Sequence, residues 1–259
     1  APTGWDVMTS ASNVVVAVLD SGVRYTHEDL ASNMWVNPED NGHGWNAITW
    51  TNEVSDDARD GHGTQMSGVI GAVGNNGKGV TGVAWGVQLM ACKCFNSTGL
   101  GSDSDIIAGL YYAMFHGARI INASFGSPGS SQSVSNAIAT AARAGIIVVA
   151  AAGNAYPRIN IDTQPYYPAC YPLDNLVSVA YTAADDSLGI LSNDGATNVD
   201  LAAPGEQIYS TYNGSDASYY GFYSGTSFAT AYVSGTLALM LATYPTENYQ
   251  QIISRLLKA

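Results

Sequence analysis

Val14-Val15-Val16-Ala17-Val18-Leu19-Asp20-Ser21-Gly22 is a run of mostly β-branched residues that ends in a carboxylate and a turn. A near-continuous apolar run of this length is typical of a strand buried on both faces at the centre of a parallel sheet. Functional groups in open α/β sheets gather at the carboxyl ends of such strands. The stretch therefore predicts an α/β fold and makes Asp20 a candidate functional residue.

The other apolar segments alternate between strand-like and helix-like patterns along the chain. Strands are expected over 13–19, 88–94, 119–123, 146–151 and 176–181, and helices over 104–116, 132–144 and 247–258. Such alternation indicates βαβ crossovers, with helices on both faces of a mostly parallel central sheet. We therefore expect a three-layer α/β fold. A single domain over residues 1–259 is also expected, because no repeat or linker-like composition interrupts the chain.

The charge balance narrows the classes of partner. The chain has nine basic and 21 acidic residues, so its net charge is −12. This charge disfavours nucleic acid and anionic membranes as binding partners. No apolar stretch approaches the roughly 20 residues that cross a bilayer. Only 12% of the residues are charged and 28 are glycine, which favours a loop-rich enzyme over a disordered or coiled chain.

Three cysteines, Cys92, Cys94 and Cys170, leave at least one thiol without a partner in the chain. Cys92 and Cys94 share one face of a predicted strand, which is poor geometry for a mutual disulfide, whereas Cys170 could bond either of them. A cysteine nucleophile would need a histidine in a comparable motif, and none stands beside these positions. Inert buried thiols are the expected state.

Two further motifs place a histidine and a serine at glycine-flanked helix starts. Asp60-Gly61-His62-Gly63-Thr64 opens a helix of small residues, and Gly225-Thr226-Ser227 leads into an apolar helix that ends before Pro245. The first turn of a helix favours negative charge, which suits a serine that becomes an alkoxide during the reaction. Ser227 as nucleophile, His62 as general base and Asp20 as its orienting carboxylate form a candidate triad. The alternative is that Ser227 only caps its helix.

The motifs together resemble the subtilase family of subtilisin-like serine proteases, from about Trp5 to Tyr244. The order Asp, His, Ser is that of subtilisin. The matching stretches are Asp20-Ser21-Gly22, His62-Gly63-Thr64, Ala151-Ala152-Gly153-Asn154, Asp200-Leu201-Ala202-Ala203-Pro204-Gly205 and Gly225-Thr226-Ser227. The resemblance implies a subtilisin-like fold and a broadly specific serine endopeptidase that acts through an acyl-enzyme. Departures from the family pattern at Gln65, Phe228 and Ala231-Tyr232 remove no proton-transfer group.

Asn154 follows a predicted strand and so is expected at the same sheet edge as Asp20. Its amide can donate to the oxyanion of a tetrahedral intermediate together with the backbone N–H of Ser227. The alternative is that Gly153-Asn154 merely turns the chain.

The resemblance also implies a substrate cleft. Gly99-Leu100-Gly101 and Ser124-Phe125-Gly126 match two extended segments that hold a peptide between them by main-chain hydrogen bonds. The other matching substrate-binding residues are Ala152, Gly153 and Tyr166. Tyr166 falls at the floor of the pocket for the residue before the cleaved bond. There it predicts a preference for small or medium side chains.

One loop, Gly71 to Val80, resembles the structural calcium loop of many subtilases. The matching ligands are the side chains of Asp29 and Asn76, with carbonyl oxygens from the loop, and such oxygen ligands suit calcium. An Asn- and Gly-rich surface turn is the alternative, and Lys78 places a cation in the loop. No cofactor is needed for the chemistry itself.

The resemblance further implies a secreted monomer that acts on polypeptide substrates. Such enzymes are made as zymogens whose pro-segment serves as inhibitor and folding chaperone. We therefore expect the leader and pro-segment to be absent and Ala1 to be a processed end. Asn213-Gly214-Ser215 is one of three glycosylation patterns in the chain.

Two rival functions use the same residues. An esterase or a peptide ligase could transfer the acyl group from the same triad to another acceptor. A silent subtilase fold could serve as a binding module, although the intact motifs argue against it.

Overall fold

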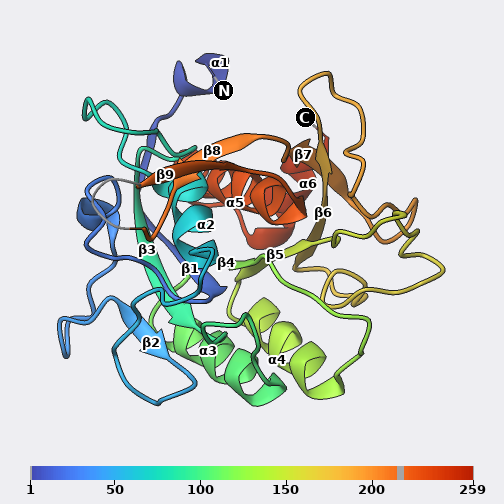
Figure 1. The fold of residues 1–259 in the computed structure, drawn as a ribbon, viewed down its shortest axis with the longest axis horizontal. Helices are drawn as coiled ribbons and strands as arrows, with labels where there is room; N and C mark the ends of the chain where they lie inside the picture. Colours follow the sequence, from blue (N-terminus) through green and yellow to red (C-terminus); the bar gives the residue numbers. More distant parts are fainter. Residues whose placement is uncertain (1, 215–218, 259) are drawn as a thin grey trace.

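A seven-stranded parallel sheet forms the centre of the structure, a computed structural model that describes residues 2–214 and 219–258 (Figure 1). Ala1 and Ser215 lie outside the described residues. The strand order is β2-β3-β1-β4-β5-β6-β7, and a separate antiparallel hairpin joins β8 to β9. The strands are β1 Ser10–Asp20, β2 Gly44–Asn46, β3 Gly86–Lys93, β4 Ile120–Ala123, β5 Ile147–Ala151, β6 Leu176–Thr182, β7 Leu201–Pro204, β8 Ile208–Thr211 and β9 Tyr220–Tyr223.

The helices connect these strands and cover both faces of the sheet. They are α1 Pro2–Trp5, the 3₁₀ turn η1 Ala31–Asn33, α2 His62–Gly71, α3 Asp103–Phe115, α4 Gln132–Arg143, α5 Thr226–Thr243 and α6 Tyr249–Leu256. Figure 1 shows α2 and α5 on one side of the sheet, with α3 and α4 on the other. The expected three-layer α/β architecture is therefore confirmed.

Strand β1 owes its central position to its apolar side chains. Val14, Val16 and Val18 enter the core beneath α2 and α5. Successive side chains of a strand point to opposite faces, so Ala17 and Leu19 enter the second core beneath α3 and α4. A strand with polar residues on one face could not lie between two helical layers.

The expected strands and helices are present, with ends that shift by up to three residues. The sequence patterns missed β2, β7 and the β8–β9 hairpin. These strands have only three or four residues, and β7 alternates between half-buried and exposed positions. Short edge segments of this kind carry little periodicity.

The three cysteines are free thiols, so the disulfide that the sequence left open does not form. Cys92 and Cys94 are fully buried, and burial raises the pKa of both thiols. Cys170 is half-buried, and its sulfur accepts a hydrogen bond from the Tyr166 N–H. Across the described chain, no helix is both long enough and apolar enough to cross a bilayer.

Candidate active site

The carboxyl ends of three neighbouring strands bring the predicted residues to one edge of the sheet. Asp20 is the last residue of β1, Ser124 follows β4, and Asn154 lies three residues after β5. These strands run parallel, so their carboxyl ends lie at the same edge.

Asp20 and His62 are in direct contact. The Nδ1 atom of His62 lies 2.8 and 2.9 Å from the two carboxylate oxygens of Asp20. The Asp20 side chain is buried, whereas that of His62 is 28% exposed. Burial lowers the pKa of His62, but the charge and hydrogen bond of Asp20, helped by Asp60 and Asp56, outweigh burial and raise it to about 9.

Ser227 is the second residue of α5. Gly225 is the N-cap and no side chain caps the helix from that position, so the alternative in which Ser227 is only the cap is wrong. The Ser227 hydroxyl donates to the carbonyl of Ser124 at 3.1 Å. Across residues 2–214 and 219–258, no hydrogen bond joins His62 to Ser227.

A buried chain of hydrogen bonds fixes the backbone of Ser227 to the sheet. The Ser124 hydroxyl donates to the Ser227 carbonyl at 3.0 Å, and the Asn122 amide donates to the Ser124 hydroxyl at 2.9 Å. Ser234, two helical turns further along α5, donates to the Asn122 oxygen at 2.9 Å. Because buried polar groups are costly to leave unpaired, this chain sets how α5 lies on β4.

The side chain of Asn154 has a fixed orientation. Its Oδ1 atom accepts the N–H of Thr226, the first residue of α5, at 2.9 Å. This bond leaves the Nδ2 group as the donor available to a ligand. The Thr226 hydroxyl in turn accepts the Gly153 N–H at 3.2 Å, and Asn193 donates to the carbonyl of Ala152 at 2.9 Å. The 152–154 segment is therefore held from two sides.

The ring of Tyr166 lies between Gly126 and Gly153. A Cβ atom added at Gly126 or at Gly153 would come within 2.3 or 2.7 Å of the Tyr166 ring. The Tyr166 hydroxyl donates to the Gly126 carbonyl at 2.7 Å, and burial raises its pKa. The tyrosine therefore occupies the space between Gly126 and Gly153, two residues that the sequence assigned to substrate binding.

Residues 99–101 and 125–126 line one hollow of about 250 Å³, whose lining also includes Phe95, Ile106 and Tyr171, whereas Ser124 lines a different hollow. Neither segment belongs to a strand. The N–H of Leu100 donates to the Asn96 side chain at 3.1 Å, and its carbonyl accepts the Asn96 N–H at 2.9 Å. The main-chain groups of Leu100 are therefore already paired within the loop.

A second hollow, of about 190 Å³, lies directly beside the acid–histidine pair. It is lined by residues that include Asp20, His62 and Asp60, with Phe95 and Phe125 as apolar walls. Within the described chain, the exposed Asp60 carboxylate makes no hydrogen bond or ion pair, and its charge acts on the neighbouring His62. A larger hollow of about 800 Å³ lies along α6 and contains none of these residues.

Asp29 and Asn76 lie together, but their atoms are arranged as hydrogen-bond partners and do not fit a calcium cage. The buried carboxylate of Asp29 accepts the Asn76 amide at 2.6 Å and the Val80 N–H at 2.9 Å. The Asn76 oxygen accepts the Lys78 N–H at 2.9 Å. A cation needs oxygen lone pairs that face it, and here N–H donors occupy them. In the described chain, no group of three His, Cys, Asp or Glu side chains could hold a metal.

Sequence reasoning missed the residues that hold the site together. Thr226 and Asn193 fix the Asn154 segment, and Asn122 fixes Ser124. Asp56 joins the turn after β1 to the start of α2. These residues carry no motif of their own, and only the fold brings them to their partners.

Comparisons with known proteins agree with this architecture. The model of the subtilase family matches residues 11–259. Thermitase from Thermoactinomyces vulgaris is 35% identical over 240 residues, which cover 93% of this chain and 78% of thermitase. Subtilisin E from Bacillus subtilis is 37% identical over 250 residues, which cover 95% of this chain and 60% of the relative. The crystal structure of a cold adapted subtilisin-like serine proteinase superposes with a TM-score of 0.83 at 28% identity, covering 97% of this chain and 83% of that one.

Proposed function

Because this chain belongs to the subtilase family and is a subtilisin-like serine endopeptidase, we propose that it hydrolyses peptide bonds through an acyl-enzyme on Ser227. The Ser227 oxygen attacks the carbonyl carbon as His62 takes its proton, and His62 then returns that proton to the leaving amine. Water attacks the ester by the same route and restores the serine. Asp20 holds the imidazole in the required tautomer and stabilises its cation.

The observation that carries the proposal is the contact of 2.8 Å between His62 and Asp20 at the sheet edge where α5 presents Ser227. The second ring nitrogen of His62 is then directed away from the carboxylate. Asn154 supports the same assignment, because its Nδ2 group and the Ser227 N–H lie at the start of one helix. These two donors would stabilise the developing oxyanion.

One rotation is needed for the reaction to begin. The Ser227 hydroxyl donates to the Ser124 carbonyl in this structure, so it has to turn from that acceptor toward His62. We propose that this turn is a change of the serine side chain from one of its three staggered rotamers to another. Catalytic hydrogen bonds of free enzymes often tighten only when substrate binds.

We further propose broad specificity limited by Tyr166. Its ring fills the space between Gly126 and Gly153, which leaves room for small or medium side chains before the cleaved bond. Asp20 and Asp60 line the second hollow, and their negative charges favour neutral or cationic substrates over acidic ones.

The setting we propose is a secreted monomer acting as one peptidase domain over residues 1–259. It matures from a zymogen whose pro-segment acts as inhibitor and chaperone. The family membership supports this setting.

A serine-directed covalent reagent and unfolded casein together test the proposed reaction. We expect labelling at Ser227 and cleavage of casein, with both abolished in Ser227→Ala. Labelling with turnover of esters alone would point to the esterase. Absence of both labelling and turnover would point to a binding module without catalytic activity.

A further inference from the structure

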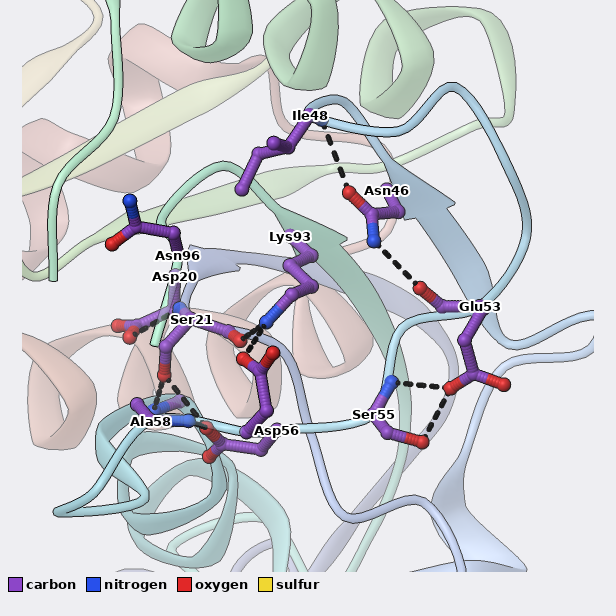
Figure 2. A network of polar contacts seen from close by, with 12 residues as sticks. Asp20, Ser21, Asn46, Ile48, Glu53, Ser55, Asp56, Ala58, Lys93 and Asn96 are labelled. Atoms are coloured by element: carbon purple, nitrogen blue, oxygen red, sulfur yellow. Dashed lines mark hydrogen bonds and ion pairs between the residues drawn. The ribbon is translucent and has the colours of Figure 1, made fainter. Parts of the chain in front are cut away.

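Asp56 bridges the two chain segments that carry the acid and the histidine of the proposed triad. One of its oxygens accepts the Ser21 hydroxyl at 3.0 Å. The other accepts the N–H of Thr64 at 3.0 Å and its hydroxyl at 2.6 Å. Figure 2 shows Ser21 between Asp20 and Asp56, with the Ser21 side chain directed at the Asp56 carboxylate.

Both ends of this bridge lie next to reacting groups. Ser21 follows Asp20 directly, and its N–H donates to the Asp20 carboxylate at 2.8 Å. The Ser21 hydroxyl also accepts the N–H of Gly63, which follows His62, at 3.1 Å. A shift of Asp56 would therefore move the carboxylate and the imidazole relative to each other.

Asp56 also completes the start of α2. Gly61 is the N-cap of this helix and offers no side chain to its free N–H groups. Asp56 accepts the N–H of Thr64, the third residue of the helix, as an N-cap side chain would. The helix that presents His62 is thus capped by a residue from outside it.

Within residues 2–214 and 219–258, the carboxylate of Asp56 forms no ion pair with a lysine or arginine. The ammonium group of Lys93 donates to the Ser21 carbonyl and forms an ion pair with Asp57, not with Asp56. Burial raises the pKa of Asp56, and the hydrogen bonds from Thr64 and Ser21 oppose that shift. When ionised, Asp56 adds its negative field to those of Asp20 and Asp60 around the imidazole.

We propose that Asp56 is a positioning residue for the reaction assigned above: it fixes Asp20 and His62 in mutual register, and its charge supports the imidazolium. This inference depends on the proposed function. It goes beyond it, because Asp56 touches no reacting atom.

Three single variants separate the two effects. Asp56→Asn removes the negative charge and replaces one of the two carboxylate oxygens that accept hydrogen bonds from Ser21 and Thr64. Ser21→Ala removes the hydrogen bond from Ser21 to Asp56 and keeps the charge of Asp56. Asp60→Asn removes a nearby negative charge and keeps the hydrogen bonds of Asp56. For each variant, kcat and kcat/KM are measured against pH on a peptide substrate, with rates normalised to the active sites that titrate with the serine reagent.

We expect Asp56→Asn to lower kcat about 10–100-fold, since a misplacement of about 1 Å costs on the order of 10² in rate. The acidic limb of its pH–rate profile, where activity falls as His62 becomes protonated, should move to lower pH, because loss of a negative charge destabilises the imidazolium. Ser21→Ala should lower kcat without moving the limb, and Asp60→Asn should move the limb with a smaller loss of kcat. If Asp56→Asn does not fold, Ser21→Ala still tests the bridge.

The proposal is overturned if Asp56→Asn lowers only the melting temperature and the active fraction, with kcat per site and the acidic limb unchanged. It is equally overturned if Ser21→Ala leaves kcat unchanged. Failure of the wild type to label at Ser227 is a different result, which removes the proposed function itself.

Discussion

The hydroxyl of Ser227 and the ring of His62 illustrate how single side chains set the chemistry. The hydroxyl is held by the Ser124 carbonyl, and the imidazole is held by Asp20. Substrate binding has to turn the Ser227 hydroxyl toward His62 while the imidazole stays in place. A protonated imidazole cannot accept the serine proton, so the acid–base state of His62 decides at which pH the site works.

We predict that activity rises with pH through a pKa of about 9, because only neutral His62 can act as base. Each unit of pH below that value should lower kcat/KM about tenfold. A folded pKa above the ordinary value of 6.5 means that the charged pair with Asp20 stabilises the fold below pH 6.5. That contribution should be lost as the pH rises toward 9.

A pH–rate profile, with denaturant unfolding of Ser227→Ala over the same range, measures both trends. The inactive variant avoids self-digestion during unfolding. An acidic limb at or below pH 6.5 would contradict the expected shift of His62.

The Tyr166 ring should determine which residue precedes the cleaved bond. We predict that Tyr166→Gly raises kcat/KM for a Phe peptide relative to the matched Ala peptide about tenfold or more, because it opens the space between Gly126 and Gly153. Tyr166→Phe is the control, since it keeps the ring and loses only the bond to Gly126. A wild type that already favours Phe would refute the idea.

The helices fall into two groups by the way they begin. Ser102, Ser131 and Asn248 cap α3, α4 and α6 from their own N-cap positions. In contrast, α2 and α5 start at glycines and take their acceptors from Asp56 and Asn154. The two helices that carry the histidine and the serine are therefore the ones whose N-termini are completed by side chains from outside the N-cap position, Asp56 from the preceding loop and Asn154 from another part of the chain.

We predict that Asn154→Ala reduces kcat by about 10²–10³, the loss seen when an oxyanion-hole donor is removed from subtilisin. It should also cost about 1 kcal/mol of stability, because α5 loses its acceptor. Asn154→Asp keeps an acceptor and loses the donor, so it should lose rate with little change in stability. Ser102→Ala, at α3, should lose stability alone. Steady-state kinetics and thermal melts distinguish these outcomes, and an Asn154→Asp variant with full activity would rule out the oxyanion role.

Much of the candidate site could be predicted because its members follow strong patterns. Asp20 ends a buried apolar strand, and His62 and Ser227 stand in glycine-flanked helix starts. Asp56 could not be predicted, because it is one acidic residue in a polar loop and its partner Ser21 is 35 residues away. The buried bond between Asn122 and Ser234 spans 112 residues and is likewise visible only after folding.

At the scale of the whole molecule, two apolar cores on opposite faces of one sheet support the edge where the site lies. The loop from Gly71 to Val80, which contains Asn76, follows directly from the end of α2. It is held by hydrogen bonds to the buried Asp29 and by an ion pair of 3.3 Å between Lys78 and Glu28. The predicted calcium ligands therefore already satisfy one another.

From this arrangement we predict that a chelator leaves the melting temperature unchanged within about 2 °C. Asn76→Ala should lower it, because the variant leaves a buried carboxylate oxygen without a donor, which costs about 1–3 kcal/mol. Calorimetry with and without chelator, on the Ser227→Ala background, measures both effects. A large fall in melting temperature on chelation would restore the calcium assignment.

The order in which the chain supplies its parts has a consequence for biosynthesis. Asp20 and His62 belong to the first third of the polypeptide, whereas α5, with Ser227, comes after the last strand of the sheet and packs across β1 and β4–β7. A nascent chain that ends at the last strand of the sheet contains the acid and the base but not yet the nucleophile. Self-digestion during synthesis is thereby postponed until α5 has been made and has docked on the sheet.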